Sequence, residues 1–317
     1  MVGTPEWLSH MSRSSTALAV LLLLASSLLR SEVRADQEST PSATRTVVVS
    51  VVDSRGVPIA GLRPADVVVK EDGRVRPVTH LAVSQVPLTV ALLLDNSGLG
   101  LQSIREGAAA FVTRLGGRAV IALITTGGRN VTVVDYTDST ATLVAAINRT
   151  YARNVTDAFL VDGIVEAART FETREARRPV IVSVGVEGMD FSTARPAEVF
   201  AILQRTRTQL HMVRLGAPVI ARSNALGAER GESMVDEMTR FNAVLGQAPP
   251  RSGGRIEQLS AHSGIPSLLA AIADELAGQY ELTYATSNPN GSDLKLDVST
   301  VRRGLRVRAP QRVGPPR

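Results

Sequence analysis

Three short apolar runs stand out in the middle of the chain. They cover residues 88–94 (LTVALLL), 119–125 (AVIALIT) and 179–184 (PVIVSV), and turn residues bound each of them. Continuous apolar runs of this length are typical of strands that are buried on both faces in a parallel sheet. A fourth strand is predicted over residues 208–215 (TQLHMVRL).

Apolar positions recur at helical spacing between and after these runs. Ile104, Ala108, Phe111 and Leu115, for example, fall on one face of a helix. The same spacing predicts helices over residues 160–171, 196–203 and 265–279, and another near Met234 to Leu245. Because strands and helices alternate, the pattern predicts a doubly wound, Rossmann-like α/β domain with a mostly parallel sheet.

Both ends of the chain have the pattern of β-strands instead. Turns at Asp53–Gly56 and Glu71–Gly73 separate β-branched runs before the α/β domain, and three short alternating segments follow it within residues 280–310. Neither end has enough strands to be stable alone. We therefore expect the two ends to pair as a small β-sheet or sandwich, with the α/β domain inserted between them.

A leader precedes the first β segment. Arg13 is followed by an apolar run over residues 16–29, which is shorter than the ~20 residues of a membrane-spanning helix, and Ala35 completes a small-residue cleavage site. The pattern predicts a signal peptide, with Met1 or Met11 as the start, and a secreted or periplasmic protein without a span in the mature chain. If the leader is not cleaved, it anchors the protein to the membrane. The predicted divisions are 1–35 (signal peptide), 36–44 (linker), 45–86 (N-terminal β segment), 87–277 (α/β domain) and 278–313 (C-terminal β segment).

Composition narrows the functional classes. The formal net charge is +5, but the arginines are scattered among acids and no basic stripe with interleaved aromatic residues is present, so no nucleic-acid partner is expected. The absence of cysteine excludes a thiol nucleophile and a disulfide. The histidines are isolated, and Ser97 is not in a G-x-S-x-G motif. These features argue against an enzyme.

Oxygen-bearing side chains follow the predicted strands. Asp95 and Ser97 come directly after the first strand, and Thr156 precedes the helix over residues 160–171. In open α/β sheets, ligands bind at the carboxyl ends of the strands. These three residues are therefore the candidate ligand-binding positions, although capping or turn formation at a strand-to-helix junction would also favour them.

The chain resembles the von Willebrand factor type A domain, and specifically the bacterial VWFA-related proteins in which this domain lies between β-rich flanks. The matching segments are SVVDSRGVPIAGLRPADVVVKEDG, ALLLDNSG, GQYELTYAT and GLRVRA. The resemblance covers Thr46 to Arg312. It implies a von Willebrand factor A-like fold for the central domain.

The family builds a metal-ion-dependent adhesion site from a D-x-S-x-S run, a threonine and a further aspartate. Asp95, Ser97 and Thr156 match three of these positions, whereas Leu99 replaces the second serine and Val184 stands where the aspartate is usual. Aliphatic side chains cannot bind a hard cation. The resemblance therefore implies a degenerate site that holds Mg²⁺ or Mn²⁺ weakly or not at all.

Two acidic residues just beyond the third strand, Glu187 and Asp190, are possible substitute ligands. We expect no cofactor, or weakly bound Mg²⁺ or Mn²⁺. The expected function is that of an exported, non-enzymatic adhesion or scaffold module that binds a protein or cell-surface partner through the strand-end face. An exported α/β hydrolase, or another enzyme with an unrecognised site, is the alternative, since fold alone does not exclude it.

Overall fold

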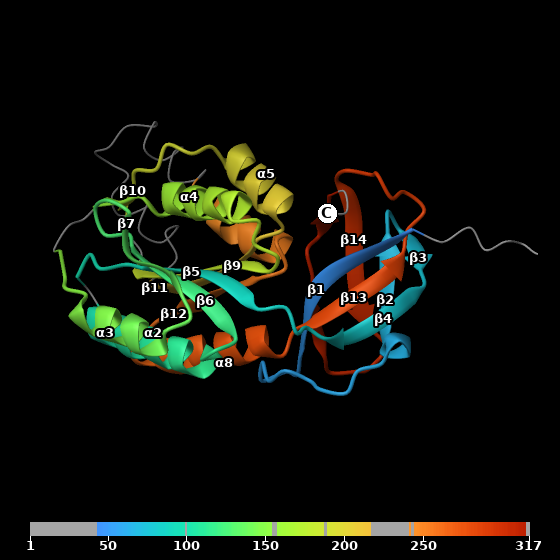
Figure 1. Cartoon of the computed structure of the whole chain (residues 1–317), viewed down its shortest axis with the longest axis horizontal. Coiled ribbons are helices and arrows are strands. Elements are labelled where there is room, and N and C mark those ends of the chain that lie inside the picture. The colour runs from blue at the N-terminus through green and yellow to red at the C-terminus, as the bar shows by residue number, and fades with distance from the viewer. Residues whose placement is uncertain are drawn as a thin grey trace, which may run out of the picture. The chain divides into compact units, whose positions relative to one another are not determined.

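The computed structural model of the protein describes residues 43–98, 100–153, 157–186, 189–216, 241 and 244–314 (Figure 1). The predicted signal peptide lies outside the described residues, as does most of the predicted helix near Met234 to Leu245. Within the described residues, no helix combines the length and the apolar character needed to cross a membrane.

A six-stranded sheet forms the centre of the α/β domain, in the order β12-β11-β9-β5-β6-β7. Its strands are β5 (Leu88–Leu94), β6 (Ala119–Thr125), β7 (Val131–Thr137), β9 (Pro179–Val186), β11 (Gln209–Leu215) and β12 (Arg255–Leu259). Neighbouring strands are parallel except at one edge, where β7 pairs antiparallel with β6. The predicted mostly parallel sheet is confirmed.

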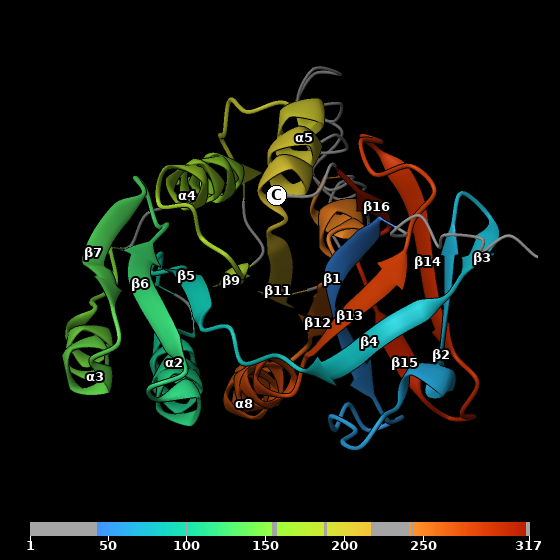
Figure 2. The same cartoon turned by 45° about the vertical axis from the view of Figure 1, so that its right-hand side comes forward.

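Helices cover both faces of this sheet (Figure 2). Side chains of α2 (Leu101–Leu115), α3 (Thr140–Arg149) and α8 (Ile265–Ala277) share one hydrophobic cluster with the sheet. Side chains of α4 (Leu160–Thr173) and α5 (Pro196–Thr206) share a second cluster on the other face. This arrangement is the doubly wound α/β fold.

Strand β5 shows why the sequence runs are continuously apolar. Val90, Leu92 and Leu94 belong to the first cluster, whereas Ala91 and Leu93 belong to the second. Successive side chains of a strand point to opposite faces of the sheet, so a central strand with helices on both sides needs apolar residues at every position.

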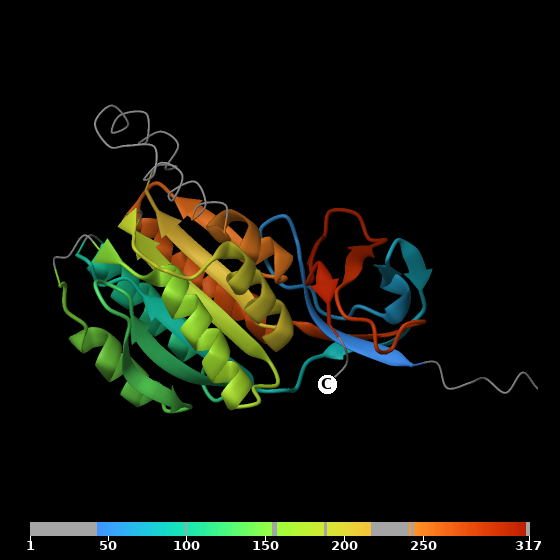
Figure 3. The ribbon, with the colours of Figure 1, turned by 90° about the horizontal axis from the view of Figure 1, so that it is seen from above.

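The chain ends combine into two four-stranded sheets, ordered β15-β1-β13-β4 and β16-β14-β2-β3. Figure 3 shows strands from the N-terminal part, in blue, beside strands from the C-terminal part, in red. N-terminal strands are β1 (Thr44–Val52), β2 (Val67–Glu71), β3 (Arg74–Arg76) and β4 (Val78–Val83), and C-terminal strands are β13 (Tyr280–Ala285), β14 (Leu294–Thr300), β15 (Arg306–Arg308) and β16 (Arg312–Val313). Strand β1 pairs antiparallel with β13, and β2 with β14. The prediction that the N- and C-terminal segments pair into a small β-sheet or sandwich is confirmed, and they form two antiparallel sheets.

Buried glutamine and arginine side chains connect β1 and β11 with the segment that follows α8. Gln279 Nε2 donates to Ser50 Oγ at 2.9 Å and to Gln209 Oε1 at 2.7 Å, while Arg178 Nη2 donates to Gln279 Oε1 at 2.8 Å. These hydrogen bonds compensate the burial of the two glutamine side chains and of Arg178 Nη2, whereas Arg178 Nε has no hydrogen-bond partner among the described residues.

His211 on β11 should make the stability of the protein depend on pH. The side chain is fully buried, and neither ring nitrogen has a hydrogen-bond partner among the described residues. Burial, with Arg255 and Arg308 nearby, lowers the pKa of His211 to about 3. In the unfolded chain the pKa of a histidine is about 6.5. Between the folded and the unfolded pKa the unfolded chain binds more protons than the folded one. The free energy of unfolding should therefore rise with pH from about pH 3 to about pH 6.5.

The expected contribution of His211 is at most about 1.4 kcal/mol per pH unit. Urea unfolding of the wild type and of His211→Leu, followed across the window from acid to neutral pH, measures it. The variant should show a shallower pH dependence than the wild type. Equal slopes for the two proteins would mean that His211 titrates alike in the folded and unfolded states.

Candidate functional site

The loop after β5 carries two of the sequence-predicted ligands. Asp95 is buried, and its Oδ1 accepts a hydrogen bond from the backbone N–H of Ser97 at 2.7 Å. The chain then turns through Gly98 and Gly100 at φ values of 149° and 71°, and Gly100 is the N-cap of α2. Asp95 therefore acts as a turn-forming residue here, and the capping position belongs to a glycine.

Asn96, between the two predicted ligands, ties three loops together. Its Oδ1 accepts from the N–H of Gly127 at 3.0 Å, and its Nδ2 donates to the carbonyl of Tyr151 at 3.2 Å. The Asn96 carbonyl accepts from the N–H of Arg153 at 2.9 Å. The loops that follow β5, β6 and α3 are thus held as one unit.

Strand β9 ends beside this loop, with the backbone N–H of Asp95 donating to the carbonyl of Val184 at 2.9 Å. The Val184 side chain belongs to the apolar cluster beneath α2 and α8 and is buried. The neighbouring position faces the candidate site instead, because a Cβ at Gly185 would lie 3.5 Å from Asp95 Oδ2. Gly185 is thus the place where a second carboxylate would meet Asp95.

Asp190 follows β9 and lies beside the start of α4. Its Oδ2 accepts from the N–H of Leu160 at 2.7 Å, and its Oδ1 accepts from the N–H of Ser192 at 2.9 Å. Burial raises the pKa of Asp190, and the hydrogen bonds from these backbone groups oppose that rise. The carboxylate is already used to position the first turn of α4.

A small cavity joins these residues. Its volume is about 30 Å³, and Asp95, Ser183, Gly185 and Asp190 are among its lining residues. That volume is close to the share of one water molecule in the liquid. The structure therefore brings Asp95 and Asp190 to one cavity, whereas Thr156, Leu99 and Glu187 lie outside the described residues.

The donor set of the described residues does not fit a resident divalent cation. Asp95 and Ser97 supply one carboxylate and one hydroxyl, and Val184 is turned into the core. The carboxylate of Asp190, in the same cavity, already accepts from two backbone N–H groups. Across the described part of the chain, no group of three or more His, Cys, Asp or Glu side chains is placed to hold a metal ion. Mg²⁺ prefers octahedral oxygen ligands and gives up its water reluctantly, so two donors leave most of its coordination to water.

Two exposed aromatic side chains lie in the loops next to the strand ends. Tyr151 is 72% exposed and Phe191 is 43% exposed, although aromatic residues make up only 3% of the chain. The Phe191 ring lies 6.4 Å from that of Phe159, and the Phe191 N–H donates to the carbonyl of Ala158 at 2.8 Å. Sequence reasoning did not identify these aromatic residues, because single rings in loops carry no periodic signal.

Arginines of the same loops are exposed and carry no ion pair with a described residue. They are Arg129 and Arg153, and Arg149, the last residue of α3, is exposed and unpaired with a described residue in the same way. Several exposed arginines elsewhere on the α/β domain are paired: Arg114 with Asp274, Arg169 with Glu198, Arg174 with Asp135 and Arg205 with Glu172. The strand-end face, defined here as residues 95–98, 127–130, 151–153 and 189–192, therefore combines exposed rings with nearby cationic side chains.

No family model matches the chain, and no curated protein matches it in sequence. Several solved structures are similar to it at low sequence identity. Proximal thread matrix protein 1 from the mussel byssus is 12% identical, with a TM-score of 0.46 over 72% of this chain and 50% of that chain. A von Willebrand factor type A protein from Catenulispora acidiphila is 10% identical, with a TM-score of 0.46 over 87% of this chain and 74% of that one.

The minor pilin PilB from Streptococcus sanguinis is 12% identical, with a TM-score of 0.42 over 62% of each chain. The chain spans about half the length of the mussel protein, one structure of which holds zinc in its metal-ion-dependent adhesion site. The central domain is a doubly wound α/β fold with a six-stranded, mostly parallel sheet, which is the architecture that the resemblance to the von Willebrand factor type A domain implied.

Proposed function

We propose that the protein is an exported, non-enzymatic interaction module that binds a protein or cell-surface partner through the strand-end face. The observation that carries this proposal is the group of hydrogen bonds made by Asn96, which joins three loops. The side chain of Tyr151, in one of these loops, stays exposed. Exposed aromatic and arginine side chains on a rigid support are the residue types that dominate the energy of protein interfaces.

The polar side chains at this edge support a binding role over a catalytic one. Asp95, Asn96 and Asp190 each hold loop backbone. Asp162 does the same, because its carboxylate accepts from the N–H groups of Thr193 and Ala194 at 3.0 and 2.8 Å. Groups that are committed to backbone hydrogen bonds position a surface, and they are not poised to transfer a proton.

Partner binding at this face should not require a divalent cation. The described residues supply too few oxygen ligands, and the exposed arginines already provide positive charge. The predicted signal peptide supports export, which would place the face outside the cytoplasm, where a partner on a cell surface is accessible.

Site-specific photocrosslinking tests the proposal. A benzophenone amino acid placed at Tyr151 or Phe191 should crosslink the same partner in cells that produce the protein, with a yield that EDTA does not change. Arg177, which is exposed next to the amino end of β9, is the matched control position and should give no such product. Identical products from all three positions, or none from Tyr151, would overturn the proposed face, and loss of the product in EDTA would overturn cation independence.

A single substitution should create cation dependence at this edge. Gly185→Asp places a second carboxylate beside Asp95, because the added Cβ lies 3.5 Å from Asp95 Oδ2. Two adjacent carboxylates repel each other, and a hard cation relieves that repulsion. Mn²⁺ should therefore raise the unfolding temperature of Gly185→Asp but not that of the wild type.

Val184→Asp is the control for this experiment. It buries a carboxylate in the apolar cluster, so it should lower the unfolding temperature whether or not Mn²⁺ is present. Isothermal titration with Mn²⁺ gives the affinities of the three proteins. Micromolar binding by the wild type would show that further ligands complete a working site.

A further inference from the structure

The loop over residues 286–293 joins β13 in one sheet of the sandwich to β14 in the other. It contains Asn290 followed by Gly291, the only Asn-Gly pair in the chain. Asn290 is exposed and lies in a turn, which a hydrogen bond from the N–H of Gly291 to the carbonyl of Asn288 closes at 3.1 Å. The side chain of Asn290 is therefore in contact with water.

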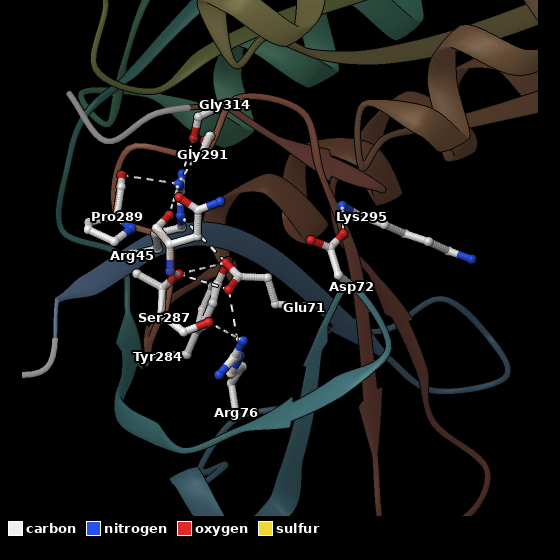
Figure 4. Close-up of polar contacts among 12 residues, drawn as sticks. Arg45, Glu71, Asp72, Arg76, Tyr284, Ser287, Pro289, Gly291, Lys295 and Gly314 are labelled. Atoms are coloured by element: carbon white, nitrogen blue, oxygen red, sulfur yellow. Dashed lines mark hydrogen bonds and ion pairs between the residues drawn. The ribbon is translucent and has the colours of Figure 1, made fainter.

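Arg45, which is buried in the sandwich, holds this loop from one side (Figure 4). Its Nη2 donates to the carbonyls of Asn288 and Gly291, both at 2.8 Å, and to that of Pro289 at 3.2 Å. Asn290 lies in the same stretch, but neither its carbonyl nor its side chain forms a hydrogen bond with a described residue. The peptide group that links Asn290 to Gly291 is therefore held by the hydrogen bond of the turn and not by Arg45.

An exposed asparagine that precedes a glycine has two groups that can react with each other. The backbone nitrogen of the glycine is a nucleophile, and the side-chain amide carbon of the asparagine is an electrophile. Glycine has no Cβ, so no side chain hinders the approach of the Gly291 nitrogen to Asn290 Cγ. The rotation that brings these atoms together has to break only the turn hydrogen bond to the Asn288 carbonyl.

The other described asparagines lack this combination of features. Asn96 precedes a serine, but it is buried and both polar atoms of its side chain are hydrogen-bonded. Asn288 precedes a proline, which has no N–H and cannot react in this way. Asn130 and Asn148 precede a valine and an arginine, whose side chains crowd the backbone nitrogen. Exposure, local sequence and hydrogen bonding therefore single out Asn290.

We propose that Asn290 is a site of spontaneous covalent modification, at which the residue becomes isoaspartate. The Gly291 nitrogen bonds to Asn290 Cγ, the Cγ–Nδ2 bond breaks, and the amide leaves as ammonia with the proton of the Gly291 N–H. Water then adds to either carbonyl of the resulting cyclic imide and breaks its bond to the Gly291 nitrogen. Opening at the main-chain carbonyl of residue 290 gives isoaspartate, in which the backbone runs through Cβ and Cγ, whereas opening at Cγ gives aspartate.

Isoaspartate lengthens the main chain between two carbonyls that Arg45 holds. The added atom lies between the carbonyls of Pro289 and Gly291, so we expect at least one of them to move away from Arg45 Nη2. A buried donor that loses its acceptor is destabilising. Arg45 also binds the carbonyl of Gly314 and lies beside Glu71, so the change affects the connection between the two ends of the chain. The modification should therefore lower the stability of the protein.

Peptide mapping of the whole protein by mass spectrometry tests the proposal after incubation in neutral and in mildly alkaline buffer. Isoaspartate should accumulate at residue 290, and faster in the alkaline buffer, because the attacking nitrogen must lose its proton. Asn288 in the same loop and the exposed Asn148 are the matched controls and should stay unmodified over the same time. Persistence of Asn290 in the folded protein would overturn the proposal, and so would equal modification of Asn148. Modification only in urea-unfolded protein would show that the turn prevents the attack.

Asn290→Gln separates the modification from other effects of incubation. The position is exposed, so the variant should fold, and its longer side chain does not form the same ring, so no isoaspartate should appear. In urea unfolding, the modified wild type should have a lower midpoint than the fresh wild type, whereas Asn290→Gln should not change on incubation. Freshly prepared Asn290→Asp adds the charge without lengthening the main chain and should unfold like the fresh wild type. Equal midpoints for the fresh and the fully modified wild type would refute the proposed effect on Arg45.

Discussion

Replacing Glu71 by alanine is expected to lower the free energy of unfolding by about 3–5 kcal/mol. Glu71 ends β2 and is buried between two arginines, with Arg45 Nε at 3.5 Å and Arg76 Nε at 3.6 Å (Figure 4). Tyr284 Oη and Thr286 Oγ1 also donate to its carboxylate, at 3.1 and 2.8 Å. Removing the carboxylate leaves guanidinium charge and two hydroxyl donors buried without their acceptor.

Urea unfolding measures the loss, with two comparison variants. Glu71→Gln keeps an oxygen acceptor without the charge, so its stability should lie between those of Glu71→Ala and the wild type. Glu106→Ala removes an exposed carboxylate of α2 and should change the free energy of unfolding by less than about 0.5 kcal/mol. A loss below about 1 kcal/mol for Glu71→Ala would show that water replaces the carboxylate in the sandwich.

The Glu71 cluster also explains why the flanks of the chain fold together. Arg45 lies at the start of β1, and it contacts both Glu71 and the carbonyl of Gly314 near the C-terminus. The backbone pairing of β1 with β13 adds a ladder of hydrogen bonds to the same connection. Either end of the chain, taken alone, leaves part of this buried charge without a partner.

The fold was predictable where burial alone determines the residue type. Strands β5, β6 and β9 are apolar throughout because helices cover both faces of the sheet, and that pattern is visible in the sequence. The Glu71–Gly73 turn was predictable as well, since Asp72 and Gly73 take φ values of 49° and 79°, which asparagine, aspartate and glycine tolerate.

Strands β7 and β12 escaped the sequence analysis for different reasons. Strand β7 is an exposed edge strand that pairs antiparallel with β6, so it lacks a buried apolar run. Strand β12 (RIEQL) begins with Arg255, which is buried in an ion cluster with Glu275. A charged residue normally indicates a surface position, and only the tertiary structure shows that its partner is buried beside it.

The candidate site was only partly predictable. The position of Asp95 at the end of a central strand followed from the apolar run before it, but the orientation of each following side chain depends on register. The alternation along β9 turns Val184 into the core and points position 185 toward Asp95. The role of Asn96 depends on Gly127 and Tyr151, which are 31 and 55 residues away in sequence.

Asn96→Ala is expected to lower the free energy of unfolding by about 1–3 kcal/mol and to loosen the strand-end face. The Asn96 side chain is buried, so its loss leaves the N–H of Gly127 and the carbonyl of Tyr151 without a protein partner. A buried backbone group left without a hydrogen bond costs about 1–3 kcal/mol. The hydrogen bond to the Gly127 N–H is buried, whereas the one to the Tyr151 carbonyl is only partly buried and adds less. The backbone bond from Arg153 to the Asn96 carbonyl does not involve the side chain and should persist.

Urea unfolding gives the change in stability, and hydrogen exchange of the Gly127 amide reports the loosening directly. Asn96→Asp is the informative comparison, because it keeps the oxygen that accepts from the Gly127 N–H and loses the amide that donates to the Tyr151 carbonyl. Hydrogen exchange at the Gly127 amide should therefore be closer to the wild-type rate in Asn96→Asp than in Asn96→Ala. Asn148→Ala, at an exposed position, serves as the control. Because a loosened face must be ordered again when a partner binds, Asn96→Ala should also reduce crosslinking from Tyr151. If the Gly127 amide of Asn96→Ala exchanged as slowly as in the wild type, other contacts would have to hold the loops. The Asn96 side chain would then not be the support on which the proposed binding face depends.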